Sequence, residues 1–135
     1  MNKFQIDKHS VILDDLTNLN QDFNKLLTIK DSVIYKSCDN LDVKINSSIN
    51  KLIIKNSNKI NITVDKTISG IEIVNSKNII LTSTENKPIY SLYIEKSDKL
   101  EIILDKKIFN STEIDIIDSE DIIFNDFNNN KILKV

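Results

Sequence analysis

Apolar and polar residues alternate along most of this chain, in short runs that break at a small residue. The runs LIIKNSNKINITV, IEIVNSKNIILTS, LYIEKSDKLEIIL and IDIIDSEDIIFND share this form, and VIYKSCDNLDVKI precedes them. Their small central residues are Cys38, Ser57, Ser76, Ser97 and Ser119, separated by 19, 19, 21 and 22 residues. Period-two alternation is typical of β-strands, and a repeat of about 20 residues indicates a solenoid.

Counting outward from each small residue assigns one face of every strand to the core. The positions five and three before it, and three and five after it, carry only apolar or aromatic side chains. They are Val33, Tyr35, Leu41, Val43, Leu52, Ile54, Ile60, Ile62, Ile71, Ile73, Ile79, Leu81, Leu92, Ile94, Leu100, Ile102, Ile114, Ile116, Ile122 and Phe124. We therefore predict an all-β protein, a single right-handed parallel β-helix of about six short coils.

The small residue is expected at the corner between two strands, where its side chain can bond the bent backbone. The chain has one Gly and one Pro, so an ordinary meander of hairpins with Gly-containing turns is disfavoured. Residues 65–69 and 105–112 are predicted to hold the second corner and a short third strand. We assign residues 31–135 to the β-helix, with an irregular polar cap near residues 128–130. Residues 1–30 are expected to form an N-terminal segment and an incomplete first coil, near residues 26–29, that packs on the solenoid.

The outward positions of the predicted strands suggest two surfaces. Before the corner they include Lys36, Lys55, Glu72, Tyr93, Glu95 and Asp115, a mixed charged and aromatic face that a protein partner can use. Its expected centre is Tyr93, flanked by Lys55, Glu72 and Glu95. A solvated face without a partner is the alternative. After the corner, Ile80, Ile103 and Ile123 point outward and suggest a covered surface. Its cover is a self-interface, a neighbour's third strand or, as we prefer, residues 1–30.

Composition narrows the classes of function. The 135 residues suggest one domain, and a net charge of −2 disfavours nucleic acid as a partner. No apolar run approaches the ~20 residues of a membrane span, and no signal peptide is recognisable, so a cytoplasmic protein is expected. With one Cys and one His, a cysteine- or histidine-based metal site is not expected, and no cofactor is predicted. Cys38 is interpreted as a small corner residue.

Adjacent carboxylates, Asp14–Asp15 and Glu120–Asp121, raise the alternative of a carbohydrate-active β-helix enzyme. Such enzymes usually need a longer solenoid with a loop-walled cleft, whereas these corners are short and the one histidine, His9, lies outside the repeat. Solvated acids are the favoured interpretation, and we expect no chemical catalysis.

The repeats resemble the C-terminal β-helix domain of adenylyl cyclase-associated proteins. NKPIYSLYIEKSDKLEIIL resembles the family's Lys-x-Pro, strand, Lys-Ser/Thr-Asp, strand segment, and VIYKSCDNLDVKI resembles its Tyr-Lys-Cys coil. GIEIVNSKNI resembles the family's preceding coil, and KFQID stands where the family has Lys-aromatic-x-hydrophobic-acidic. The resemblance therefore runs in order from about residue 3 to residue 124.

The resemblance implies a protein that binds monomeric ADP-actin and promotes exchange of ADP for ATP, which supports filament turnover. The outward residues named above are then candidate actin contacts. The family also forms homodimers by strand exchange beyond its last coil. This chain ends at Val135, so a homodimer is an open expectation. The same fold occurs in tubulin cofactor C, which gives the alternative of a small-GTPase or tubulin-pathway binding module. All eighteen basic residues are lysine, so the arginine-dependent GTPase activation of those relatives is not expected.

Overall fold

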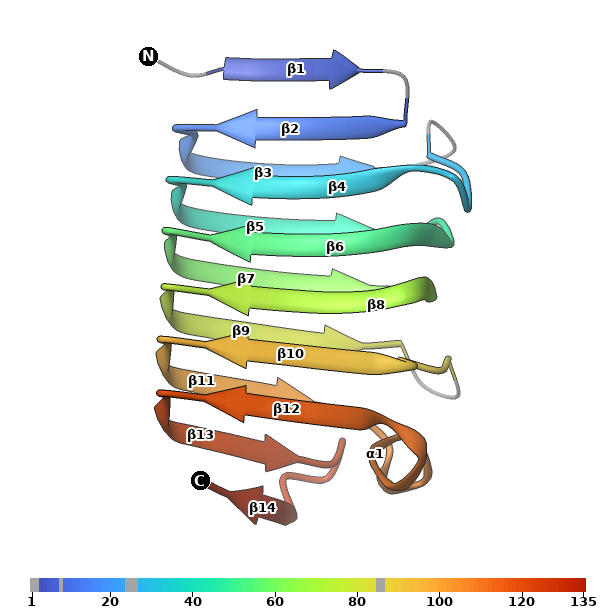
Figure 1. Cartoon of the computed structure of the whole chain (residues 1–135), viewed down its shortest axis with the longest axis vertical. Helices are drawn as coiled ribbons and strands as arrows, with labels where there is room; N and C mark the ends of the chain where they lie inside the picture. The colour runs from blue at the N-terminus through green and yellow to red at the C-terminus, as the bar shows by residue number, and fades with distance from the viewer. Residues whose placement is uncertain (1–2, 8, 24–26, 85–86) are drawn as a thin grey trace.

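The computed structural model (Figure 1) describes residues 3–7, 9–23, 27–84 and 87–135. Its strands form two sheets of seven strands each. The first sheet contains, in spatial order, β1 (Lys3–Asp7), β2 (Ser10–Asp14), β4 (Ser32–Lys36), β6 (Ile49–Lys55), β8 (Thr67–Val74), β10 (Ser91–Glu95) and β12 (Glu113–Ile117). The second contains β3 (Thr17–Phe23), β5 (Asp39–Ile45), β7 (Asn58–Val64), β9 (Lys77–Ser83), β11 (Asp98–Ile103), β13 (Glu120–Asn125) and β14 (Lys131–Lys134).

Strands of successive coils pair in parallel, and each coil contributes one strand to each sheet. Among the strands of the described residues, only β1 and β14, at opposite ends of the stack, pair antiparallel with their neighbours. Figure 1 shows the chain winding down the stack as a right-handed coil, the hand expected of parallel crossovers. The predicted parallel β-solenoid is confirmed, with about five turns.

The core lies between the two sheets and follows the predicted alternation. Of the predicted inward positions, all are buried except Ile114 and Ile116, which are half-buried and still pack against the core. Both lie on β12, which is the last strand of the first sheet. They are less covered because no further strand of this sheet lies beyond them among the described residues.

The first coil begins earlier than predicted. Strands β2 and β3 pair in register with β4 and β5, so residues 10–23 continue both sheets and no break falls at residue 30. The predicted incomplete coil at residues 26–29 includes Leu26, which lies outside the described residues; Leu27 is buried and Ile29 is exposed. In the first coil Leu16 occupies the corner position that Cys38 and the serines occupy in the others. The hydroxyl of Tyr35 donates to Oε1 of Gln21 at 2.8 Å across this end of the core.

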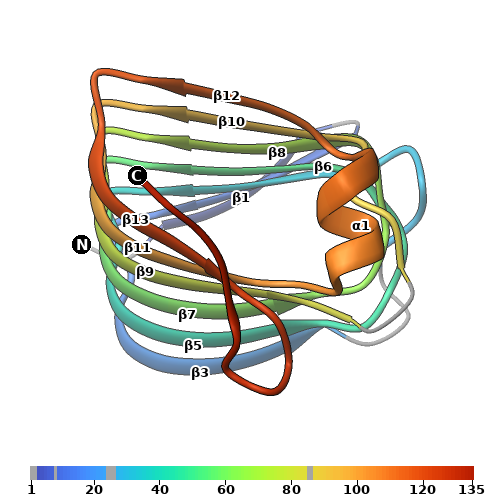
Figure 2. The same ribbon diagram turned by 90° about the horizontal axis from the view of Figure 1, so that it is seen from below.

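The prediction of a third strand is wrong. Residues 67–69 belong to the long strand β8, and residues 105–112 contain a helix, α1 (Lys106–Ser111). Asp105 caps this helix by accepting a hydrogen bond from the backbone N–H of Lys107 at 2.9 Å. Phe109 packs edge-on against Phe124 with ring centroids 5.3 Å apart. Figure 2 shows α1 at the second corner of the solenoid, on the side opposite the small-residue corner.

Non-glycine residues with positive φ shape the small-residue corner. One precedes the corner residue of each coil and another follows it by two positions. They are Asp15, Asn18, Ser37, Asn40, Asn56, Lys59, Asn75, Asn78, Lys96, Lys99, Asp118 and Asp121, with φ between 49° and 60°. Asn and Asp tolerate this left-handed region better than most residues because their short side chains can hydrogen-bond locally. The corner is therefore turned by Asn, Asp, Lys and Ser rather than by glycine.

Thr67 provides a test of core packing. Its side chain is fully buried, and its hydroxyl has no hydrogen-bond partner among the described residues. Thr67→Val keeps the shape and removes the unpaired hydroxyl, so we expect about 1 kcal/mol of added stability. Urea denaturation of the two proteins measures the difference. A loss of stability of similar size would show that the hydroxyl has a partner, such as a bound water.

Candidate functional site

The outward side chains of the first sheet form one continuous surface, which we call the first-sheet face. It consists of three parallel columns that cross strands β2, β4, β6, β8, β10 and β12. In strand order they are Ser10, Ser32, Lys51, Gly70, Ser91 and Glu113; Ile12, Ile34, Ile53, Glu72, Tyr93 and Asp115; and Asp14, Lys36, Lys55, Val74, Glu95 and Ile117. Every candidate partner contact predicted before the corner lies on this face.

Tyr93 lies among acids rather than at a mixed centre. In the register of the sheet it stands between Glu72 and Asp115, one on each neighbouring strand. Glu95 lies two residues along the same strand and accepts a hydrogen bond from the Tyr93 hydroxyl. Lys55 was expected to flank Tyr93, but it lies two strands away on β6 and pairs in register with Val74.

The hydrogen bond to Glu95 stabilises the neutral form of the Tyr93 phenol. It raises the pKa of Tyr93 above its ordinary value, with smaller contributions from desolvation and from the charges of Glu95, Glu72 and Asp115. A tyrosine phenol is neutral at physiological pH even at its ordinary pKa, and here its hydroxyl donates a hydrogen bond to the Glu95 carboxylate. The ring is left half-exposed at the centre of the acidic group.

An ion pair that the sequence reasoning did not find lies in the middle of this face. Lys51 Nζ contacts Glu72 Oε2, and the two residues come from adjacent strands, β6 and β8. Each side chain is 31% exposed, so the pair is accessible from solvent. The sequence could have indicated Lys51, because the position six residues before each corner residue also points outward. The predicted columns stopped at four residues before it and so omitted Lys51.

The isoleucines expected to form a covered surface lie on the other sheet. Ile80 and Ile123 occupy one column on β9 and β13 but are separated by Glu101, and Ile103 lies in the next column beside Thr82 and Asn125. The amide of Asn125 donates to the Glu101 carboxylate at 3.1 Å. Residues 10–23 lie at the opposite end of the stack (Figure 1) and do not cover these isoleucines. The preferred cover of residues 1–30 is thus wrong for its described part.

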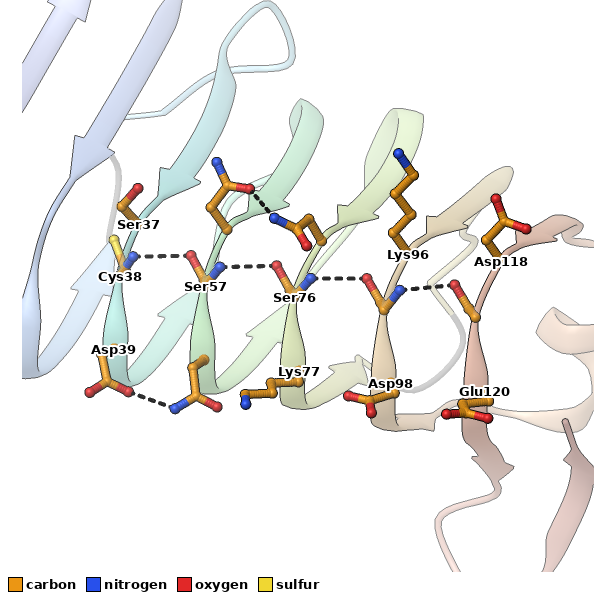
Figure 3. A pocket seen from close by; sticks show the side chains of 15 residues that line it. Ser37, Cys38, Asp39, Ser57, Ser76, Lys77, Lys96, Asp98, Asp118 and Glu120 are labelled. Atoms are coloured by element: carbon orange, nitrogen blue, oxygen red, sulfur yellow. Dashed lines mark hydrogen bonds between the residues drawn. The ribbon is translucent and has the colours of Figure 1, made fainter.

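The small-residue corner forms a shallow polar groove (Figure 3). Its floor is a hydrogen-bonded ladder in which each backbone N–H donates to the serine hydroxyl of the next coil: Cys38 to Ser57, Ser57 to Ser76, Ser76 to Ser97 and Ser97 to Ser119, at 3.0–3.1 Å. Each hydroxyl in turn donates to the carbonyl two residues before it, at 2.8–3.0 Å. The ladder explains why serine recurs at this position, since its hydroxyl both accepts and donates here.

Cys38 belongs to this ladder and has a structural role. Its thiol donates to the carbonyls of Leu13 and Lys36 at 3.3 and 3.4 Å. Burial is the main cause that raises the pKa of Cys38, so the unreactive thiol form is favoured. Within the described part of the chain, no group of three or more His, Cys, Asp or Glu is placed to hold a metal ion.

The ladder gives a direct stability prediction. Ser76→Ala leaves the Ser57 N–H without its acceptor and removes one of the two donors to the Val74 carbonyl, which keeps the Asn56 N–H, and we expect a loss of about 1.5 kcal/mol. Ser119→Ala is the matched control, because Ser119 caps the end of the ladder and is more exposed, so its loss should be smaller. Chemical denaturation measures both. Equal effects would contradict the view that the buried middle of the ladder matters most.

These features define a class: a short two-sheet parallel β-solenoid with a small-residue ladder at its corner and a charged outer sheet face. The family whose sequence profile is described as Adenylate cyclase associated (CAP) C terminal matches residues 3–128, and the chain belongs to this family. CAP proteins as a family are actin regulators, and the family is not known as catalytic.

The fold is also similar to a solved structure. The crystal structure of cyclase-associated protein from Cryptosporidium parvum superposes with a TM-score of 0.88 at 21% sequence identity, covering 98% of this chain and 82% of that chain. At this identity the likeness shows the fold alone. A search of curated protein sequences found no significant match. No helix among the described residues is long and apolar enough to cross a membrane.

Proposed function

We propose that this protein binds actin monomers and promotes the exchange of ADP for ATP on them, and that it does so in the cytoplasm. Membership of the CAP C-terminal family is the observation that carries the proposal, because the family's proteins regulate actin. The first-sheet face is the surface we assign to actin. Lys36, Lys55, Glu72, Tyr93, Glu95 and Asp115 are its candidate contacts.

The face has the character of a protein-binding surface. It offers a half-exposed aromatic ring, half-buried aliphatic side chains and charges of both signs on a rigid sheet. Aromatic anchors surrounded by polar residues dominate the energetics of many protein interfaces. Because the contacts stand on paired strands rather than on loops, little ordering is needed on binding, which favours affinity.

Exchange would follow from differential binding. A protein that binds the open-cleft conformation of actin more tightly than the closed one shifts actin toward the open conformation, and nucleotide then leaves faster. Such a mechanism needs no catalytic residue. It requires only that the surface fit one actin conformation better than the other.

Release of fluorescent etheno-ADP from actin monomers tests the proposal. We expect substoichiometric amounts of the protein to accelerate release, and calorimetry to show a complex with ADP-actin. An unchanged release rate together with no heat of binding would rule the proposal out. The alternative partner, a small GTPase or a tubulin-pathway protein, is tested in parallel by pull-down with purified candidates.

A further inference from the structure

The second corner of the solenoid forms one edge of the molecule, which we call the second-corner edge. It consists of residues 28–31, 46–48, 65–68, 87–90 and 105–112, where the chain passes from the second sheet to the first. Figure 1 shows these segments stacked in one row, with α1 at its lower end. At about 4.8 Å for each coil the row is roughly 20 Å long, so a flat surface can contact several of its tips at once.

The second-corner edge carries exposed positive charge. Within the described part of this edge there are five lysines and three aspartates. No ion pair joins these lysines to an acid among the described residues, and Glu85 lies outside them. The lysines are Lys30, Lys66, Lys87, Lys106 and Lys107, and all but Lys66 are exposed.

The aspartates of the edge are half-buried, because each carboxylate accepts hydrogen bonds from its own loop or from a neighbouring one. Asp31 accepts from the backbone N–H and the hydroxyl of Thr28, at 2.7 and 3.1 Å. Asp105 caps α1, and Asp65 accepts from the Ser48 hydroxyl at 3.5 Å. The positive charge of this edge is therefore more exposed than the negative charge, although the whole chain has a net charge of −2.

Exposed apolar side chains lie among these lysines. Ile29 is 58% exposed, Ile68 39% and Tyr90 51%. The parallel bridge between Thr67 and Ile89 sets the residues that follow them, Ile68 and Tyr90, side by side on neighbouring coils. Each of the three exposed apolar residues lies within three positions of a lysine in the sequence. Exposed apolar groups rimmed by charge mark a surface that contacts a partner or a membrane.

We propose that the second-corner edge docks on the surface of an anionic lipid membrane. The apolar tips enter the boundary between headgroups and acyl chains, while the exposed lysines contact anionic headgroups. Tyr90 suits this boundary because its ring is apolar and its hydroxyl is polar. Lysine suits it as well, since its long aliphatic stem can lie along apolar surface while the ammonium group stays in water. A contact of this kind lies on the bilayer and requires no membrane-spanning helix.

The combination of residues favours a bilayer over other anionic partners. A nucleic acid would attract the lysines but would gain little from the aliphatic tips of Ile29 and Ile68. The core of a protein–protein interface is usually depleted of lysine, whereas here lysines alternate with the apolar tips along the row. A bilayer interacts favourably with both groups at once, since apolar burial and attraction to anionic lipid add to the same binding.

The membrane contact goes beyond the proposed function and does not depend on it. The candidate actin contacts stand on the outward face of the first sheet, and none of them belongs to the second-corner edge. Binding to lipid and binding to actin therefore use different residues. Either proposal can fail while the other holds, and the lipid experiment contains no actin.

Co-sedimentation with vesicles tests the inference, using vesicles of phosphatidylcholine alone and of equal parts phosphatidylcholine and phosphatidylserine. We expect the protein to bind the mixed vesicles in low salt, to bind less as salt is raised, and not to bind phosphatidylcholine alone. Lys87→Glu/Lys107→Glu should lower the partition coefficient at least about tenfold by removing charge attraction. Ile68→Ser/Tyr90→Ser should lower it by a similar factor without changing the net charge.

Matched controls lie on the second sheet. Lys44→Glu/Lys77→Glu makes the same change of net charge at exposed lysines away from the edge. Leu19→Ser/Ile80→Ser removes apolar side chains that are 39% and 38% exposed, close to the value for Ile68. Both controls should bind the mixed vesicles like the wild type. Thermal denaturation checks that every variant is folded, and Tyr90→Ser alone replaces the apolar pair if that pair unfolds.

Three results would overturn the inference. The first is a wild-type protein that does not bind the mixed vesicles. The second is binding that the controls abolish and the edge variants leave unchanged, and the third is equal binding to phosphatidylcholine alone. Fluorescence anisotropy with a labelled poly-uridine strand tests the nucleic-acid alternative. Lysine-dependent binding of this strand without binding to vesicles would show that the edge takes a dissolved polyanion instead of a membrane.

Discussion

Replacing Gly70 with alanine is expected to destabilise the fold by about 3 kcal/mol, which lowers the melting temperature by about 10 °C. Gly70 is the single glycine of the chain and has φ of 108°, a conformation that L-residues rarely adopt. It lies in β8, where the pairing with β6 shifts register. A Cβ built there would lie 2.1 Å from Ser91 Oγ and 2.6 Å from the Ser91 carbonyl oxygen. Thermal denaturation measures the loss.

The two clashes can be separated. Ser91→Ala removes the hydroxyl but leaves the carbonyl, so Gly70→Ala/Ser91→Ala should recover only part of the lost stability. Ser69→Ala, at the exposed neighbouring position, is the control for placing alanine in this strand, and its effect should stay within about 0.5 kcal/mol. If Gly70→Ala melted within about 2 °C of the wild type, the close approach of β8 and β10 at this point would be refuted.

The core was predictable because it rests on a strict physical rule. Side chains of a strand alternate between its two faces, so the repeat placed residues such as Ile73 and Ile79 on the inside from sequence alone. Parallel coils stack equivalent positions, which made each repeat a check on the others. The serine position was predictable as a corner, but its ladder of hydrogen bonds to the next coil was not, since that needs the spatial register.

The first coil was missed because its residues depart from the repeat. Leu16 takes the small-residue position, and Gln21 takes a core position where it accepts a hydrogen bond from Tyr35. Helix α1 was missed for a different reason. Its six residues are too short for a periodic signal, and its stability comes from the Asp105 cap and from packing of Phe109 on Phe124.

The sequence was enough to predict which residues of the candidate face point outward, but not which of their side chains contact one another. Alternation placed Glu72, Tyr93 and Asp115 outward, and the structure puts them side by side on adjacent strands. Which residues interact depends on side-chain reach across strands, so the Lys51–Glu72 pair and the Tyr93–Glu95 hydrogen bond appeared only in three dimensions. Likewise, the placement of Lys36 and Lys55 on β4 and β6, with acids on β8, β10 and β12, appears only once the register between coils is fixed.

Replacing Tyr93 with alanine is expected to weaken actin binding about 30-fold, or about 2 kcal/mol, with a matching loss of exchange activity. The half-exposed ring stands at the centre of the group of acids formed by Glu72, Glu95 and Asp115, and truncation removes its contact area. Tyr93→Phe keeps the ring and loses only the hydroxyl that bonds Glu95, so it should retain most of the affinity. Calorimetry with ADP-actin measures both variants.

Tyr90→Ala is the matched control for this prediction. Tyr90 is 51% exposed but precedes β10 and lies outside the first-sheet face, so its loss should leave affinity near the wild-type value. Thermal denaturation of all three variants separates a binding defect from unfolding. Should Tyr90→Ala weaken actin binding while Tyr93→Ala does not, the actin surface would lie toward the second corner, near Ile68 and α1.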